Sequence, residues 1–446
     1  MALAHLEPAE GADHARVEIH LRRAAEAAEG PALEDGAGPW DVLLPGLERR
    51  DLEVAIRRVC DLGNAPLARR LCAAERRRSL HLPVSTAPAP FTAAVAAEHR
   101  HRFEARYLRG VVGDGEFAAW ASLRDAELAA EWPLRAPRVG EARLEFRVFE
   151  DWMVGFLVLP SNDVRMHRWS VGRVAVGRAV AELRGWLKSA DDPRRLLRAS
   201  AALHDLVWAP FEADLRDVGR VLVAPDGPLC GLPFATLWRD RFVAERHDVA
   251  VVRPAPPPAF AEPSPVAPRV ALVVGEATAR DLELGTLCGE QGWFLGIDTR
   301  MGEDLSPERL LETLGGARVV QLVGEIDAGP MLALADGQPA LPVERVACAL
   351  GAGGAVCVVL CGPVEGANGR AAIGGLLAGA RGGVLARHVA LDDDGGMLLR
   401  FLAGAAAATG PWPLVEALGE ARRAAISADL SPATWGAYEL YLADGV

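Results

Sequence analysis

Short, wholly apolar runs alternate with helical segments through the C-terminal two-thirds of the 446-residue sequence. The clearest runs begin at Val221, Val270, Val319 and Val356, and residues with helical spacing lie between them. Strands that are apolar on both faces belong inside a sheet, and helical connections allow neighbouring strands to run parallel. We therefore predict an α/β fold in which a sheet of mainly parallel strands is covered by helices on both faces.

The first 140 residues have another pattern, in which Ala- and Leu-rich amphipathic segments are separated by Gly and Pro. One segment, from Leu47, has helical spacing and stops at Gly63. Further helical tracts are expected at 91–108 and 115–131. We predict an α-helical N-terminal domain over residues 1–140 and the α/β domain over 141–446. No clear period near 34 residues is present, so the pattern leaves open whether these helices form a true repeat.

The second domain begins with a predicted hairpin. Apolar residues alternate up to Val148, an acidic turn follows at Glu150 and Asp151, and a second apolar run ends at Leu159. Helices are expected at 170–188, at 193–217 and from Ser306 onward, and the proline-rich segment 254–268 is expected to be an extended link.

Charge and hydropathy exclude several classes of function. The net charge of −12 gives no broad basic surface, so we expect no nucleic-acid partner. No stretch has the roughly 18–20 consecutive apolar residues of a membrane span, and the first residues are acidic where a signal peptide is basic. We expect a cytoplasmic protein with no membrane contact. Its seven cysteines are scattered and form no CxxC pair, so we expect reduced thiols and neither a metal nor another cofactor.

Cys361 is the residue most open to a chemical interpretation. It ends the buried run VCVVLC and precedes Gly362-Pro363, a position from which a thiol can reach the crevice at the carboxyl end of a strand. The alternative is a small buried hydrophobe. A thiol nucleophile needs a base that lowers its pKa, usually histidine. Of the ten histidines, His388 alone falls at a strand end near this crevice, and Glu325 ends the preceding apolar run.

Seven segments, in this order along the chain, resemble those of one family. They are RLEFRVFEDWMVGFLV, VLVAPDGPLCGLPFATL, LLETLGGARVVQLVGE, MLALADGQPALPVERV, VVLCG, GLLAGARGGVLARHV and PLVEALGEARRAAISADLSPATWGAYELYLADG. This order is similar to that of the CHAT domain, a caspase-like cysteine peptidase family related to separases and often attached to helical repeats. The resemblance runs from about residue 141 to the C-terminus and implies a caspase-like sheet.

The resemblance places Cys361 at the family's nucleophile and Glu325 at its catalytic histidine. Ile326 stands at the glycine whose backbone contributes to the oxyanion site, and His388 stands where the family usually has tryptophan. A carboxylate beside a thiol raises the thiol pKa, so the thiolate becomes scarcer. Loss of an oxyanion donor costs about 2.7–4 kcal/mol of transition-state stabilisation. The resemblance therefore implies a peptidase fold whose machinery has been lost.

Two functions follow from these residues. The first is a catalytically silent pseudo-peptidase that acts as a scaffold, sensor or regulatory partner. The family context implies bacterial conflict or antiphage signalling, with an active protease or a cleavable effector as the protein partner. The alternative is an active cysteine endopeptidase that cleaves a protein partner with Cys361 as nucleophile, its site completed by Glu325, His388 or a group from the partner.

Overall fold

The computed structural model describes most of residues 53–79, together with 137–189, 192–253, 270–274, 297–301, 319–323, 325–327, 331–333, 341–363, 366–387 and, except for one residue, 396–443. Contacts divide the chain into two units, Met1–Arg135 with Val164–Arg168 and Ala136–Asp163 with Trp169–Val446. The tracts expected at 91–108 and 115–131, the link at 254–268 and the start of the helix at Ser306 lie outside the described residues.

The described part of the first unit contains helix α4 (Ala65–Ser79) and helical residues before it. The predicted break at Gly63 is present, with Gly63 at φ +70°, a conformation that glycine adopts without steric cost. Asn64 then caps α4, because its side-chain oxygen accepts a hydrogen bond from the Leu67 N–H at 3.2 Å. Ile56 and Leu67 are both fully buried.

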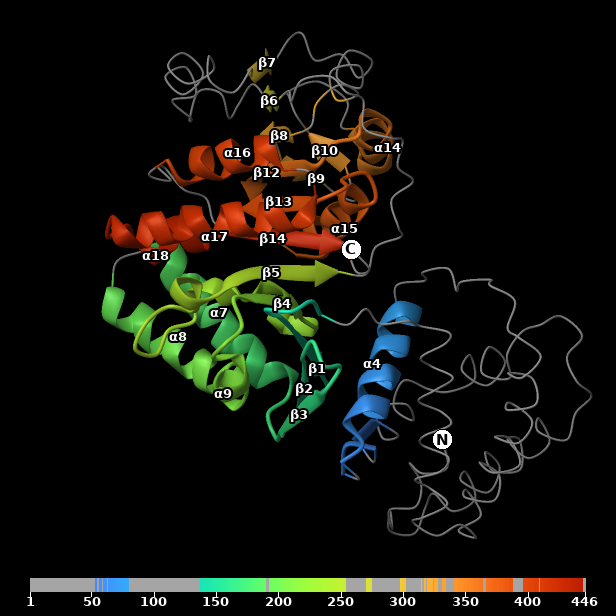
Figure 1. Ribbon diagram of the computed structural model, residues 1–446, viewed down its shortest axis with the longest axis vertical. Helices are drawn as coiled ribbons and strands as arrows, with labels where there is room; N and C mark the ends of the chain where they lie inside the picture. Colours follow the sequence, from blue (N-terminus) through green and yellow to red (C-terminus); the bar gives the residue numbers. More distant parts are fainter. Residues whose placement is uncertain are drawn as a thin grey trace, which may run out of the picture. The chain divides into compact units, whose positions relative to one another are not determined.

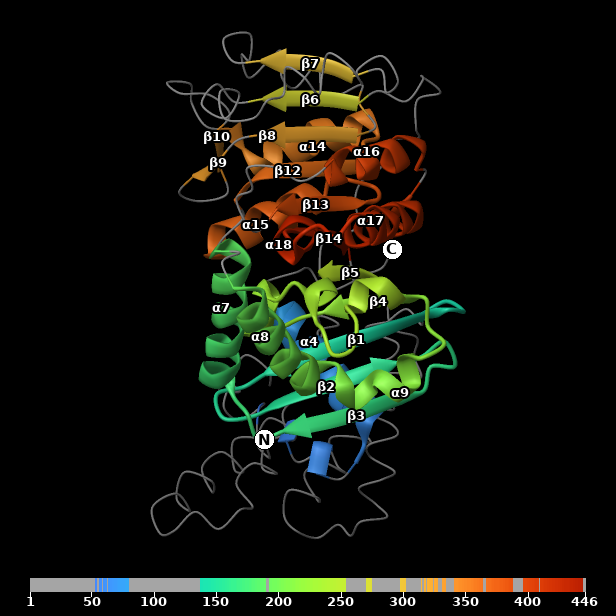
Figure 2. The same ribbon diagram turned by 90° about the vertical axis from the view of Figure 1, so that its left-hand side faces the viewer.

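Among the described residues eleven strands form one sheet, in the order β3-β2-β1-β4-β5-β14-β13-β12-β8-β6-β7 (Figures 1 and 2). The strands are β1 (Glu141–Val148), β2 (Met153–Val158), β3 (Val164–Trp169), β4 (Arg220–Ala224), β5 (Asp248–Arg253), β6 (Val270–Val274), β7 (Ile297–Met301), β8 (Val319–Val323), β12 (Cys357–Pro363), β13 (Gly383–Arg387) and β14 (Tyr438–Ala443). The predicted α/β class with a mainly parallel sheet is confirmed. The predicted hairpin is also present, because β1 and β2 pair antiparallel across the turn after Val148.

Nine of the eleven strands form two parallel blocks that run in opposite directions. In one block β1, β4, β5 and β14 are parallel, and in the other β13, β12, β8, β6 and β7 are parallel. The blocks meet where β13 and β14 pair antiparallel, with Leu385 opposite Leu440. The carboxyl ends of the two blocks therefore lie at opposite edges of the sheet.

Helices cover both faces, as the apolar strands require. On one face α16 (Met397–Ala407), α17 (Pro411–Ser427) and α18 (Pro432–Gly436) pack on the residues that include Val359 and Leu385. On the other face α14 (Val343–Gly353) and α15 (Gly366–Leu377) pack on Val358 and Leu360. Over β1 and β4, α7 (Arg173–Ser189) and α8 (Pro193–Val207) enclose a third apolar cluster. Each side of β12 is thus buried, which explains its continuous apolar run.

The helix predicted at 193–217 is shorter than expected. It begins as predicted at Pro193, after Asp192, whose carboxylate accepts from the N–H groups of Arg194 and Arg195, but α8 ends at Val207. A 3₁₀ turn (Ala209–Phe211) and the short α9 (Glu212–Leu215) follow. Pro210 accounts for the break, since proline lacks the N–H and clashes with the preceding helical turn.

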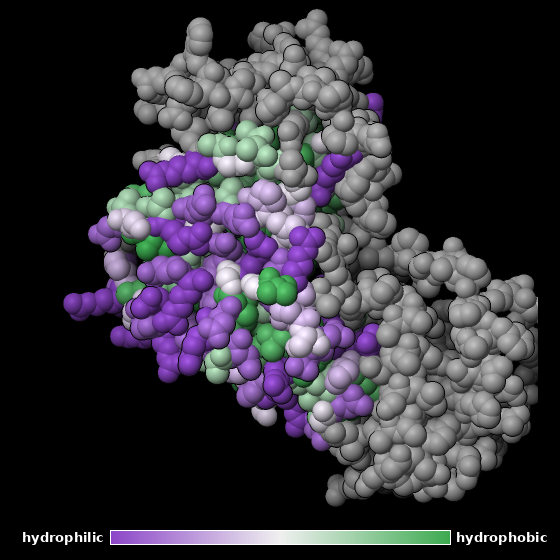
Figure 3. All heavy atoms as spheres, viewed as in Figure 1, coloured by the Kyte–Doolittle hydropathy of each residue, from purple (hydrophilic) through white to green (hydrophobic). Residues whose placement is uncertain are grey.

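Few large apolar side chains are exposed among the described residues, as expected when helices cover the sheet. Val139 and Val174 are the large apolar side chains exposed among the described residues, and the surface over α7, α8 and α9 is largely hydrophilic (Figure 3). Within the described part of the chain, no helix is both long and apolar enough to cross a membrane.

Candidate functional site

One predicted site residue, Cys361, lies on β12 of the second block, and the other, Glu325, comes just after the neighbouring strand β8. β8 and β12 pair in parallel, with Val319 opposite Cys357 and Leu322 opposite Leu360 (Figure 2). Cys361 comes one residue after this pairing. Glu325 comes two residues after β8 and begins the short strand β9 (Glu325–Asp327). The backbone thus brings Cys361 and Glu325 to the same carboxyl edge, while the chemical role of each stays a prediction.

The backbone is irregular at Cys361. Along β13, Ala386 pairs with Leu360 and the next residue, Arg387, pairs with Pro363, so Cys361 and Gly362 are extra residues in a bulge of β12. Bulges redirect side chains at the ends of strands and are frequent beside functional sites. Pro363 has no N–H to donate, which ends the ladder there. The strand pair therefore opens at the position of the predicted nucleophile.

A small second sheet flanks this edge. β9 pairs with β10 (Met331–Ala333), which pairs with β11 (Leu341–Pro342), and β9 also contacts β12 and α15. Glu325 is opposite Ala333 and Ile326 is opposite Leu332 in this ladder. Glu325 and Ile326 are thus built into a strand that contacts β12, while their correspondence to the His-Gly pair of the resemblance stays a prediction.

Cys357, four residues before Cys361 in the same strand, lies in the core. It is fully buried, and burial raises the pKa of its thiol to about 12. A thiol with that pKa is protonated throughout the physiological range and is a poor nucleophile. Cys357 is therefore a core residue.

Two of the described histidines, His247 and His204, are not placed to serve Cys361. His388 lies outside the described residues. His247 precedes β5, three strands from β12, which corresponds to about 14 Å at the usual strand spacing. Its Nδ1 is 2.7 Å from the carbonyl oxygen of Val218, and burial lowers its pKa. His204 is buried in α8, where burial likewise lowers its pKa.

One charged residue at this edge was not singled out in the sequence. Arg387, the last residue of β13, is 8% exposed and pairs with Pro363, directly beyond the Cys361 bulge. Its Nε is enclosed and has no hydrogen-bond partner among the described residues. The available signal was a single arginine that ends the apolar run GVLAR, which forms the strand beside β12.

The Pro-Asp-Gly segment of the resemblance lies elsewhere. It follows β4, and because β4 belongs to the other block, it is at the opposite edge from Cys361. Asp226 accepts hydrogen bonds from Arg147 Nη1 and from the Val148 N–H, each at 2.8 Å. This carboxylate therefore ties the loop after β4 to the end of β1 and has a structural function.

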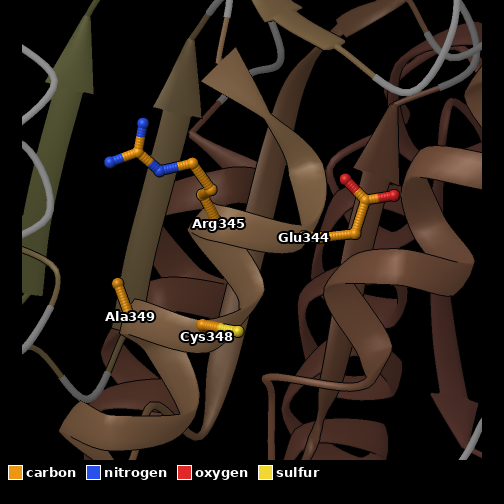
Figure 4. A pocket seen from close by; sticks show the side chains of 4 residues that line it. All are labelled: Glu344, Arg345, Cys348 and Ala349. Atoms are coloured by element: carbon orange, nitrogen blue, oxygen red, sulfur yellow. The ribbon is translucent and has the colours of Figure 1, made fainter.

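A shallow hollow of about 450 Å³ lies along α14. Figure 4 shows Glu344 and Arg345 on its first turn and Cys348 and Ala349 one turn further along. Cys348 is exposed, but the four residues that line the hollow include no histidine. Elsewhere in the described part of the chain, no group of three or more His, Cys, Asp or Glu residues is arranged to hold a metal ion.

Comparison with known proteins supports the resemblance. The family model of the CHAT domain matches residues 197–443, from within α8 to the end of β14. A search of curated proteins gave no match. The hairpin β1–β2 precedes the matched range but joins the same sheet through the pairing of β1 with β4. Because the match covers more than half of the chain, the protein belongs to the CHAT domain family.

Proposed function

We propose that this CHAT protein is a catalytically silent pseudo-peptidase that acts through protein partners, as a scaffold, sensor or regulatory partner. The observation that carries the proposal is that Glu325, which the resemblance aligns with the family's catalytic histidine, follows the strand next to that of Cys361. Neighbouring strands are about 4.8 Å apart, so the backbone leads into Glu325 from the strand directly beside that of Cys361.

The electrostatic consequence opposes catalysis. At neutral pH a glutamate near its ordinary pKa is ionised, and its negative charge disfavours the thiolate. A histidine in the same place would accept the thiol proton and then stabilise the thiolate as imidazolium. The exchange of histidine for glutamate therefore reverses the sign of the interaction at the nucleophile.

The oxyanion side of the site has also changed. Ile326 replaces the family's glycine, and it lies within the β9–β10 ladder opposite Leu332. A β-branched side chain restricts the backbone that glycine leaves free, so the approach of a substrate carbonyl is hindered. These two changes at consecutive residues support a site that does not cleave. A role in bacterial conflict or antiphage signalling, with an active protease or a cleavable effector as partner, is part of the proposal and rests on the family alone.

The alternative, an active endopeptidase, is favoured by the bulge at Cys361 and Gly362. A bulge presents a residue at the edge of a sheet, which is where a nucleophile must lie. In this case Glu325, His388 or a group from the partner would complete the site.

One substitution gives opposite results under the two functions. Glu325→Gln removes the negative charge, so for a silent site it lowers the Cys361 pKa and speeds alkylation by iodoacetamide at pH 7.5. If Glu325 is the general base, the same change slows alkylation. The rate is measured at each cysteine by mass spectrometry, and the buried Cys357 is the internal control.

A second arm tests turnover directly. The purified protein is incubated with a peptide library, alone and with the products of neighbouring genes. We expect no cleavage by the wild type and a gain of reactivity toward peptide electrophiles in the double variant Glu325→His with Ile326→Gly. Cleavage that depends on Cys361 in the wild type would refute the silent site.

A further inference from the structure

A tight turn before β1 holds Val139 almost entirely in solvent. Val139 is 95% exposed, against 55% for Val174, the other large apolar side chain exposed among the described residues. In this turn the Glu141 N–H donates to the Arg138 carbonyl oxygen at 2.9 Å, and the Glu141 carboxylate accepts from the Arg138 N–H at 3.1 Å. Gly140 has φ +80°, as a type II turn requires at its third residue. These contacts fix an apolar side chain in an outward position.

Strand β4 anchors the same turn. The Gly140 carbonyl oxygen accepts from the N–H groups of Gly219 and Arg220, at 3.0 and 3.1 Å. The Arg220 guanidinium donates to Glu141 at 2.8 Å and to Glu416 at 2.5 Å. The turn is therefore set before a ligand arrives, and binding does not have to order it.

Trp412, at the start of α17, lies beside this turn. The guanidinium carbons of Arg138 and Arg220 lie over its indole ring, 4.8 and 5.1 Å from the centroid. Arg220 has two carboxylate partners, whereas Arg138 is exposed and has no ion pair within the described part of the chain. A contact with a ring orients a guanidinium and leaves N–H donors available. Arg138 is therefore a positioned cation that can still bind a carboxylate.

Arg138, Val139 and Trp412, which we call the turn surface, lie at the edge of the sheet that also carries Cys361. β1 and β4 begin there, and the antiparallel pairing of β13 with β14 places the amino ends of the first block at the edge where β12 ends. Five strand spacings, about 24 Å, separate β1 from β12. An extended polypeptide of about seven residues spans that distance.

We propose that the turn surface binds a partner polypeptide through a segment in which an apolar side chain lies next to a carboxylate. The apolar side chain packs on Val139, and the carboxylate accepts hydrogen bonds from Arg138, whose guanidinium matches that group. Trp and Arg are also the residue types most enriched at the energetic centres of protein interfaces. The inference goes beyond the proposed function, because it holds whether or not Cys361 cleaves.

The charges at this place favour a single carboxylate over a polyanion. Arg138 and Arg220 are balanced in number by Glu141 and Glu416, and the whole chain has a net charge of −12. Nucleic acids bind through many phosphates at once and need an excess of cations. One cation without a carboxylate, beside an exposed valine, instead fits a short stretch of polypeptide.

The test begins with a phage-displayed library of random heptapeptides, selected on the purified full chain. We expect enrichment of peptides that have Leu, Ile, Val or Phe within two positions of Asp or Glu. The best peptide is then synthesised, and its affinity is measured by calorimetry beside a version in which Asn or Gln replaces the acidic residue. The acidic version should bind about tenfold or more tightly, as a charge-assisted hydrogen bond implies.

Variants of the turn surface give the second arm. Val139→Ser and Arg138→Gln should each weaken the peptide about tenfold, and Arg138→Gln should also flatten the dependence of affinity on salt. The matched controls are Val174→Ser and Arg178→Gln, which alter an exposed valine and an exposed arginine of α7 and should leave affinity unchanged. All four side chains are exposed, so the melting temperature should not change. A lower melting temperature for Val139→Ser would show that the fold itself uses this side chain and would overturn the proposal.

Three other results would refute this partner. One is a selected peptide that binds wild type and Val139→Ser equally. Another is a mixed-sequence single-stranded oligonucleotide that binds more tightly than any peptide and loses affinity in Arg138→Gln, since the ligand would then be a nucleic acid. The third is a dimer, seen by light scattering, that Val139→Ser dissociates, since the occupant would then be a second copy of the chain. None of these readouts involves cleavage or Cys361, so their failure is distinguishable from failure of the silent site.

Discussion

The contact between Asp226 and Arg147 gives the most direct test of how the Pro-Asp-Gly segment works. The side chains are 15% and 6% exposed, and the carboxylate accepts both Arg147 Nη1 and the Val148 N–H at 2.8 Å. Loss of one member of a buried pair costs about 3–5 kcal/mol, because the other charge is left enclosed. Asparagine keeps one acceptor, worth about 1 kcal/mol. We therefore expect Asp226→Asn to lower the free energy of unfolding by about 2–4 kcal/mol.

The assay is urea unfolding followed by tryptophan fluorescence. A double-mutant cycle with Arg147→Met separates the pair from the bond to Val148 N–H. The double variant Asp226→Leu with Arg147→Met should recover part of the loss, since an apolar pair needs no neutralising charge. A loss below about 1 kcal/mol for Asp226→Asn, or strictly additive single effects, would refute the structural function of this carboxylate.

Three further predictions concern other parts of the fold. In the folded protein, Cys357 should resist iodoacetamide at pH 7.5, because burial raises its pKa to about 12; labelling of Cys357 at the rate of an exposed thiol would contradict its enclosure. Burial lowers the His247 pKa, so the unfolded state takes up the proton first and the free energy of unfolding should fall from pH 7 to pH 5. His247→Gln should make that fall shallower, and an unchanged pH profile would count against this reasoning. Gly374→Ala should stabilise helix α15 by up to about 1 kcal/mol, since nothing lies within 4 Å of the added methyl group. Gly375→Ala should destabilise the helix, because its methyl group would lie 2.7 Å from Val343 Cγ1. Equal unfolding curves for the two variants would show that α15 shifts to accommodate the second methyl group without cost.

The sequence predicted those parts of the fold that depend on local patterns. The continuous apolar run of β12 required burial on both faces, and alternation up to Val148 followed by an acidic turn specified the hairpin. The end of α8 was missed because the apolar spacing continues past Pro210, although the proline cannot continue the helix.

The order of strands could not be derived in this way. β5 pairs with β14 and β12 with β8, and no local pattern specifies such distant partners. The reversal between the two blocks follows from these pairings, so the opposite placement of the Pro-Asp-Gly segment was not foreseen.

For the candidate site, local sequence located strand ends but not the environment of a side chain. Cys361 and Glu325 were placed because each ends an apolar run, and the register of β8 and β12 then brings their backbones to one edge. Arg387 was not recognised because its burial and lack of a described partner depend on the packing of β12, β14 and the helices around it.

The pairing of β5 with β14 also has a consequence for biosynthesis. The apolar strand β5 is made long before its neighbour, since the chain between Arg253 and Tyr438 must be translated first. At ~5–20 residues per second this takes roughly 10–40 seconds, during which one side of β5 has unpaired backbone groups. A nascent chain in this state exposes a strand edge with which the strands of other chains can pair. The emergence of β14 from the ribosome is therefore the event that closes the sheet, and chaperones have their greatest opportunity to act before it.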